Sequence, residues 1–209
     1  PSVTTDLNGQ KMEYTYDALG RQQTIRAPYE IESGQPFTIR FEYFPAERKA
    51  HTIHYSKDGN IDTYTFADSL MRAVQTKQTG VVWSGGSNQK VSIISGRAVI
   101  DAFGRNIAAY YPMTESYGNI GTYNHATGDL QAKTEYDTHD RTTSVTLADG
   151  SVTRTVYSIG SHDGEPMLQT TVTDALGRHA ESYTDAKGRN RETVQHARGE
   201  DITVKYSYD

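Results

Sequence analysis

A five-residue motif recurs along the chain and constrains its fold more than any other feature: Asp, two variable residues, Gly and Arg. Self-similarity of this kind marks repeat proteins, in which each unit relies on its neighbours to bury its apolar face. Intact copies occupy residues 17–21, 101–105, 174–178 and 185–189, and degenerate copies occupy residues 68–72 and 137–141. The sequence therefore predicts a repeat array and leaves little room for two independent globular enzymes.

The motif residues suit a tight hairpin turn. An Asp side chain accepts backbone hydrogen bonds inside a turn, and Gly takes the left-handed conformation that a three-residue hairpin loop requires. The predicted turn residues are Asp17, Gly20, Arg21, Asp68, Arg72, Asp101, Gly104, Arg105, Asp137, Arg141, Asp174, Gly177, Arg178, Asp185, Gly188 and Arg189. The two degenerate copies replace this Gly by Met71 and Asp140. Asp tolerates positive φ and Met does not, so we expect the turn at Met71 to differ from the others.

The six motif arginines allow two interpretations. A guanidinium can pair with the motif Asp or stack on a motif aromatic ring, which would be a structural role. A row of arginines that binds phosphate or sulfate is the alternative. The net negative charge of the chain favours the structural role.

The segments between the turns predict antiparallel strands. Residues 37–43 and 202–208 alternate between apolar or aromatic and polar side chains, as half-buried strands do. Turn-forming Asn-Gly or Asp-Gly pairs begin at residues 8, 58 and 149. The chain also has 26 Thr and 15 Tyr but only 7 Leu, which favours β-structure. We predict an all-β fold of antiparallel hairpin repeats in a curved or spiralling sheet, with insertions at residues 27–36, 78–90, 111–129 and 158–166.

The charge and the cysteine content exclude several classes of function. The net charge is -5 and the sequence pI is near 5.8, so neither nucleic acid nor an anionic membrane is expected as the main partner. The absence of Cys excludes disulfides, thiolate nucleophiles and sulfur-rich metal sites. No run approaches the roughly 18 apolar residues of a membrane span, and the first residues do not form a signal peptide.

The sequence Tyr-Thr-Tyr-Asp-Ala-Leu-Gly-Arg at residues 14–21 resembles the signature of the Rhs/YD-repeat proteins. Together with a truncated Tyr-Ser-Tyr-Asp at residues 206–209, the motif copies extend this resemblance over nearly the whole chain. Residues 97–209 are similar to the large secreted bacterial proteins of the Rhs and Tc-toxin B-component kind. The resemblance implies a β-sheet ribbon that spirals into a hollow shell around a toxic or variable domain. The implied function is a non-catalytic structural module that encapsulates or presents that domain.

The resemblance also sets the expected context of the chain. We expect residues 1–209 to be a single YD-repeat segment excised from a longer polypeptide, because the last motif copy stops before its Gly-Arg and residue 1 is not Met. The implied partners are neighbouring YD repeats and an enclosed domain of the same polypeptide, in a secreted or cell-surface protein. The isolated segment is expected to self-associate through its sheet edges.

No catalytic residue or cofactor is expected in this segment. Members of the family that release a cargo use an aspartyl autoprotease built around an Asp-Pro step. This chain contains no Asp-Pro, so the resemblance carries no protease activity over to it.

Two clusters contain the residue types of metal sites, but strands and turns explain both. His51 and His54 are three residues apart, which would place them on opposite faces of a strand. Residues 58–62 offer oxygen ligands at alternate positions, as calcium loops do, but their Gly stands second instead of sixth. We predict a surface position or cross-strand pairing for the first cluster, a hairpin turn for the second, and no metal.

The single Trp suggests an alternative function. Trp83 lies among small polar residues, where its ring can stack on a sugar, with Asn88 offering hydrogen bonds and Tyr110 and Tyr111 extending the surface. A carbohydrate-binding cell-surface module is therefore the alternative, and the family resemblance implies such a role as well. The favoured interpretation is that Trp83 packs on the inner face of a strand while the tyrosines fill a β-core. Exposure of the indole ring distinguishes the two.

Overall fold

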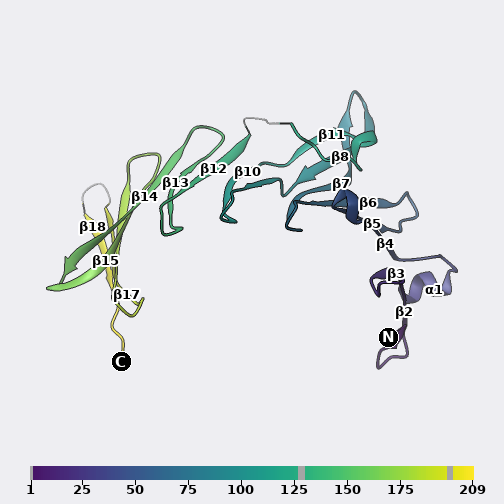
Figure 1. Ribbon diagram of the computed structural model, residues 1–209, viewed down its shortest axis with the longest axis horizontal. Helices are drawn as coiled ribbons and strands as arrows, with labels where there is room; N and C mark the ends of the chain where they lie inside the picture. The colour runs from purple at the N-terminus through teal and green to yellow at the C-terminus, as the bar shows by residue number, and fades with distance from the viewer. Residues whose placement is uncertain (1, 127–129, 197–199) are drawn as a thin grey trace. The chain divides into compact units, whose positions relative to one another are not determined.

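The computed structural model describes residues 2–126, 130–196 and 200–209. Nearly all of its regular elements are antiparallel strands, which form two nine-stranded sheets (Figure 1). The helical elements are α1 (Pro28–Glu32) and the short 3-10 helices η1 (Pro45–Glu47) and η2 (Tyr117–Asn119). The predicted all-β class of antiparallel hairpins is confirmed. The described residues hold no helix with the length and apolarity that crossing a bilayer demands.

The first sheet follows the chain from β1 to β8 and ends with β11. Its strands are β1 (Val3–Thr5), β2 (Lys11–Tyr16), β3 (Gln22–Arg26), β4 (Ile39–Phe44), β5 (Lys49–His54), β6 (Ile61–Ala67), β7 (Ala73–Ser84), β8 (Ser87–Ser95) and β11 (Met113–Ser116). This sheet belongs to a compact unit formed by residues 2–98 and 110–126.

The second sheet has the order β9, β10 and then β12 through β18. Its strands are β9 (Ala98–Ile100), β10 (Asn106–Tyr110), β12 (Gln131–Tyr136), β13 (Thr142–Thr146), β14 (Val152–His162), β15 (Glu165–Thr173), β16 (His179–Thr184), β17 (Asn190–His196) and β18 (Asp201–Lys205). Most of this sheet lies in a second compact unit, formed by residues 99–109, 130–196 and 200–209.

Every motif copy is a hairpin turn between consecutive strands. The six turns connect β2 to β3, β6 to β7, β9 to β10, β12 to β13, β15 to β16 and β16 to β17. In the first, second, fourth and sixth of these hairpins the register shifts by one residue beside the turn, as expected for a three-residue loop followed by a bulge. The motif therefore sets the register of the strands that it joins.

Two of the predicted insertions are instead the ends of the longest hairpins. Residues 78–84 and 87–90 lie in β7 and β8, and residues 158–162 and 165–166 lie in β14 and β15, with a two-residue turn at each tip. Their polar, Gly-rich composition resembles that of loops, but strand pairing continues to the tips, as in the pairing of Trp83 with Asn88. Residues 27–36 hold helix α1 as a true insertion.

One face of the first sheet carries a row of buried side chains. Phe66 on β6 lies opposite Gln75 on β7, and Lys77 on β7 lies opposite Ile94 on β8, so the four side chains share this face. Their exposed fractions are between 1% and 4%. The face therefore mixes apolar side chains with buried polar and charged ones, which must find hydrogen-bond partners.

Residues 117–126, which we call the strap, supply cover for this face. The strap follows β11, and Lys49 of β5 donates a hydrogen bond to its Gly121 carbonyl at 3.0 Å. The ring of Tyr123 meets Phe66 edge-on, with 5.8 Å between ring centroids. The strap falls within the predicted insertion at residues 111–129, of which residues 127–129 lie outside the described residues.

Candidate functional site

The six motif turns share one backbone geometry. In each turn the Asp N–H donates to the Arg carbonyl at 2.8 or 2.9 Å, and the N–H of the fourth residue donates to the Asp carbonyl at 2.9–3.2 Å. The fourth residue has a positive φ in every copy, from 61° at Asp140 to 85° at Gly104. The motif is therefore one structural unit repeated, not a set of variable loops.

The turn at Met71 has this geometry as well, which corrects the expectation that it would differ. Met71 has a φ of 62°, and the backbone bonds between Asp68 and Arg72 are the same as in the other turns. A side chain in the left-handed region costs about 1–2 kcal/mol. The hydrogen bonds made by Asp68 maintain the turn despite this cost.

A single carboxylate organises each turn. Its Oδ1 accepts the N–H groups of the third and fifth motif residues at 2.8–3.0 Å. Its Oδ2 accepts the Arg Nε at 2.7–2.9 Å. Hydrogen bonds to an ionised acceptor are stronger than those between neutral groups. The Asp therefore fixes the backbone of the turn and the direction of the Arg side chain together.

These hydrogen bonds keep the motif carboxyls ionised. Desolvation raises the pKa of Asp137, but hydrogen bonds from the backbone and side chain of Arg141 outweigh it and lower the pKa to about 2. The pKa values of the other motif aspartates are lowered as well, at Asp17, Asp68, Asp101, Asp174 and Asp185. At Asp68 and Asp174 the side-chain hydrogen bond from the motif Arg is the largest cause.

A tyrosine covers the guanidinium of four motif arginines. The distances from guanidinium carbon to ring centroid are 4.5 Å for Arg21 and Tyr43, 5.0 Å for Arg105 and Tyr136, 4.2 Å for Arg141 and Tyr157, and 5.1 Å for Arg189 and Tyr208. Each of these tyrosines donates its hydroxyl to the carbonyl of the residue that follows the Arg, at 2.8–3.0 Å. We call this three-residue unit the Asp–Arg–Tyr clamp. It joins a turn to the strand beside it in the sheet.

The Tyr-Asp order of the repeat has a physical basis in two of the clamps. Tyr136 covers Arg105 of the preceding motif, while the next residue, Asp137, holds Arg141 of its own motif. Tyr208, which also stands directly before an Asp, covers Arg189 in the same way. In the Tyr136–Asp137 pair, adjacent residues of the sequence therefore serve successive turns.

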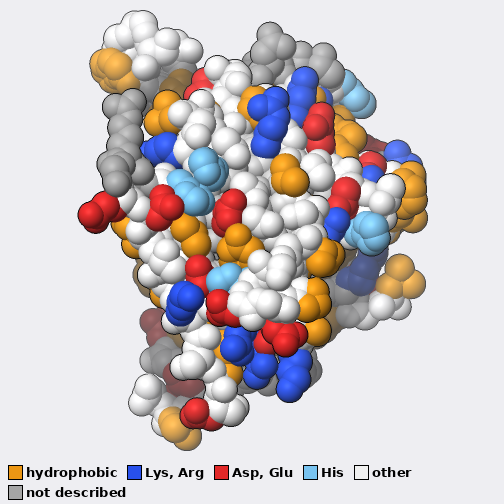
Figure 2. Space-filling view, turned by 90° about the vertical axis from the view of Figure 1, so that its left-hand side faces the viewer, with side chains coloured by type: hydrophobic (Ala, Val, Ile, Leu, Met, Phe, Trp, Pro, Cys, Tyr) orange, Lys and Arg blue, Asp and Glu red, His pale blue; other side chains and the backbone are white. Residues whose placement is uncertain are grey.

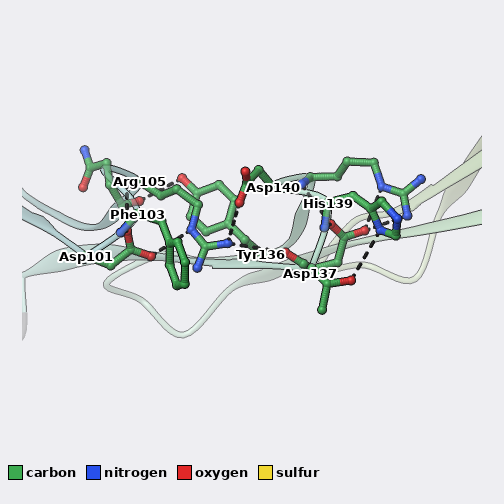
Figure 3. A network of polar contacts seen from close by, with 10 residues as sticks. Asp101, Phe103, Arg105, Tyr136, Asp137, His139 and Asp140 are labelled. Atoms are coloured by element: carbon green, nitrogen blue, oxygen red, sulfur yellow. Dashed lines mark hydrogen bonds and ion pairs between the residues drawn. The ribbon is translucent and has the colours of Figure 1, made fainter.

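Neighbouring turns are also linked directly, as Figure 3 shows. The Arg105 Nη1 donates to the Asp140 Oδ1 at 2.9 Å, and the guanidinium also lies 4.9 Å from the Phe103 ring centroid. Asp140 occupies the Gly position of its motif, so this degenerate copy supplies an acceptor that Gly lacks. Asp140 also has a φ of 61°, as the turn requires.

The structure places the predicted carbohydrate-binding residues at two different sites. Trp83 is 71% exposed, which corrects the favoured interpretation of a packed ring, and Asn88 lies directly opposite it and is exposed. Tyr110 instead lies on the guanidinium of Arg97, at 4.2 Å. Tyr111 follows it and is 42% exposed. Trp83 and Asn88 are therefore exposed together near the tip of their hairpin, whereas Tyr110 packs on Arg97.

His51 pairs across strands with two carboxylates. Its Nδ1 lies 3.0 Å from Glu42 and its Nε2 lies 3.0 Å from Asp62, while its ring stacks on Tyr64. Desolvation raises the pKa of Asp62, but hydrogen bonds from the Tyr117 hydroxyl and from His51 outweigh it and lower the pKa. Within the described ranges, no group of three or more His, Cys, Asp or Glu is arranged to hold a metal ion.

Comparison with known proteins identifies similar folds only among solved structures. No protein-family profile and no curated protein matches the chain. A crystal structure of TcdB2-TccC3 matches all of this chain with a TM-score of 0.74 and 18% identity. The Tc holotoxin pore of Photorhabdus luminescens matches all of it with a TM-score of 0.71 and 15% identity. At these identities the likeness shows the fold.

The chain is much shorter than these neighbours. It covers 13% of the matched TcdB2-TccC3 chain and 16% of the matched holotoxin chain. A crystal structure of TcdB2-TccC3-Cdc42 matches 98% of this chain with a TM-score of 0.59, and the chain covers 16% of that neighbour. The likeness therefore concerns a small section of very large proteins.

Replacing Asp137 with Asn tests the role of the carboxylate through pH. The pKa of Asp137 is lowered to about 2 from an ordinary value of 3.8, so its stabilisation is complete above about pH 4 and is lost as the pH falls through 2. Melting temperatures from circular dichroism should differ most between wild type and Asp137→Asn near about pH 6, and this difference should shrink toward about pH 2. The control is Glu32→Gln, which removes an exposed carboxylate at the end of α1. A difference that does not change with pH would contradict the role assigned to Asp137.

Proposed function

We propose that this chain is a non-catalytic YD-repeat module that forms part of a β-sheet shell in a large exported bacterial protein. The shell would encapsulate or present another domain of the same polypeptide, such as a toxin or variable domain. The observation that carries the proposal is the Asp–Arg–Tyr clamp. Its Asp and Arg belong to the motif that resembles the Rhs/YD-repeat signature, two of its four tyrosines directly precede an Asp, and it recurs in both sheets.

The comparisons support this proposal at the level of the fold. The similarity to Tc toxin structures extends over the whole chain, while the chain covers only 13% to 16% of those proteins. If this chain were one section of a continuous shell wall, all of it would match a small part of a much longer shell protein, as it does here. The resemblance of the motif to the Rhs/YD-repeat family supplies the shell function, and the fold likeness is compatible with it.

The two sheets have the properties that a wall section needs. Each clamp joins one hairpin to the next strand, so the array can grow strand by strand. The outermost strands, such as β1 and β18, have one unpaired edge within the described residues, where neighbouring repeats would continue the sheet. On the face in Figure 2, acidic and basic side chains are interspersed, so this face presents no broad field of one sign.

Electron cryo-microscopy of the longest natural polypeptide that contains these residues tests the proposal. We expect residues 2–209 to form a section of a closed wall, with density for another domain on its inner side. The same images would show whether the neighbouring repeats pair with the edge strands. An open sheet, solvated on both faces and with no other domain beside it, would contradict the shell function.

Carbohydrate binding at Trp83 is the second candidate function. The observation that favours it is the 71% exposure of the indole ring, opposite the polar side chain of Asn88. An exposed ring at the end of a hairpin is accessible to a sugar that would stack on it. This role is compatible with the shell, because the hairpin tip lies apart from the buried face of the sheet.

The indole fluorescence tests this second candidate directly, since Trp83 is the only Trp in the chain. We expect an emission maximum typical of a water-exposed indole and a saturable change on titration with a binding polysaccharide. A variant with Trp83→Ala should lose binding when the same polysaccharide is measured by calorimetry, while Tyr111→Ala should retain it. Emission that is indifferent to a broad panel of bacterial and host polysaccharides would remove the candidate.

A further inference from the structure

The face beneath the strap has an unusual composition for a protein core. Gln75 and Lys77 are each 1% exposed, and they lie beside Phe66 and Ile94 on the same face of the sheet. Buried amide and ammonium groups are retained only where hydrogen bonds compensate for their loss of water. The partners of these groups therefore show what the face is built to bind.

The strap provides those partners mainly with its backbone. Three buried or half-buried cations donate to its carbonyl oxygens. The pairs are Lys77 Nζ with Asn119 O at 3.0 Å, Lys49 Nζ with Gly121 O at 3.0 Å, and the Arg97 guanidinium with Ala126 O. A carbonyl oxygen is present at every residue of any polypeptide, so these contacts require the backbone path of the strap, which includes η2, and no particular side chain.

The side chain of Gln75 binds both backbone groups of one strap residue, Asn124. Its Oε1 accepts the N–H of Asn124 at 2.8 Å, and its Nε2 donates to the carbonyl of the same residue at 3.2 Å. The side-chain amide thus forms the two hydrogen bonds that a neighbouring β-strand would form. Any residue other than Pro can accept this pairing.

Other contacts depend on the side chains of the strap, among them the Lys90 Nζ at 4.0 Å from the Tyr117 ring centroid and the buried side chain of Ile120. The Tyr123 ring lies edge-on against Phe66, and the Tyr117 hydroxyl donates to Asp62 at 2.5 Å. The Asn124 amide also donates to Glu115 at 2.8 Å. Two aromatic anchors therefore accompany the backbone contacts.

The charges on this face do not fit a polyanion. Lys77 pairs with Glu115, and Lys49 pairs with Glu47 at 2.6 Å, so two of the three cations have carboxylate partners. Asp62 adds another acidic group to the same face. A phosphate-rich ligand would meet these carboxylates, whereas a neutral peptide backbone needs only the hydrogen bonds that remain.

From this pattern we infer that the face is a binding surface for a polypeptide segment that carries an aromatic residue and passes through a short helical turn, and that the strap occupies it in the same chain. The surface forms hydrogen bonds with the carbonyl and N–H groups of the segment, and one aromatic ring of the segment packs against Phe66. It accepts segments of different sequence, because most of its hydrogen bonds reach the backbone. The inference rests on contacts inside the first unit and does not depend on the shell function.

A strap-replaced variant of the full chain tests this inference. Residues 117–126 are replaced by Gly-Ser repeats of the same length, and circular dichroism checks that the sheet signal is retained. Three fluorescein-labelled peptides are then titrated by anisotropy. The first has the sequence of residues 117–126, the second has the same composition in scrambled order, and the third has both tyrosines replaced by Ala.

We expect the variant to bind the native-order and scrambled peptides with Kd values within about threefold of each other, and the Tyr-free peptide about tenfold more weakly. The intact chain should bind all three at least about tenfold more weakly, because the tethered strap competes at high effective concentration. Adding Gln75→Leu and Lys77→Met to the variant should weaken binding about tenfold. The matched control, Lys11→Met on the exposed start of β2, should not.

Two results would overturn the inference. One is binding of the native-order peptide alone, which would mean that the strap is held by its sequence. The other is a variant that retains its sheet signal and binds no peptide. If the strap-replaced variant does not fold, the intact chain with Tyr117→Phe and Tyr123→Ala replaces it. This second variant should bind the native-order peptide more tightly than the wild type does, and no increase would equally reject the inference.

Discussion

The Asp carboxylate of each motif turn is the interaction on which the remaining structure depends. It accepts two backbone N–H groups and one guanidinium N–H within five residues, so it fixes the turn and the Arg together. The turn fixes the register of its hairpin, and the directed Arg provides a surface on which a tyrosine of the adjacent strand can lie. The hydrogen bonds to the motif Asp outweigh the preference of a non-Gly fourth residue for negative φ, as the φ of 62° at Met71 shows. A local hydrogen-bonding pattern thereby becomes a connection between successive hairpins.

The first sheet depends on a second constraint, the need of buried polar groups for partners. Gln75 and Lys77 lie where a globular core would normally have apolar side chains, and the backbone of the strap satisfies them. The two constraints are related, because both use backbone groups as the partners of charged or amide side chains. An architecture of this kind tolerates changes of sequence wherever the backbone path is kept. This property fits a fold that persists at 18% identity to its structural neighbour.

The parts of the fold that were predictable from sequence are those decided by local geometry. Asp, Gly and Arg stand at fixed positions within five residues, so the turns and the antiparallel hairpins follow from the motif. Tyr43 and Tyr157 follow their arginines by 22 and 16 residues, and only strand register brings them together. The strap was predicted merely as part of an insertion, because its Gly-rich sequence has no periodicity. Exposure of Trp83 was mispredicted because its strand extends beyond the covered part of the sheet.

A double-mutant cycle on Arg141 and Tyr157 tests most directly whether the clamp joins turn to strand. These two side chains have a guanidinium-to-ring distance of 4.2 Å, and the Tyr157 hydroxyl binds the Thr142 carbonyl at 3.0 Å. Urea unfolding followed by circular dichroism would be measured for wild type, Arg141→Ala, Tyr157→Leu and the double variant. We expect a coupling free energy of about 0.5–1 kcal/mol between the two sites. Additive effects, with no coupling beyond experimental error, would contradict it.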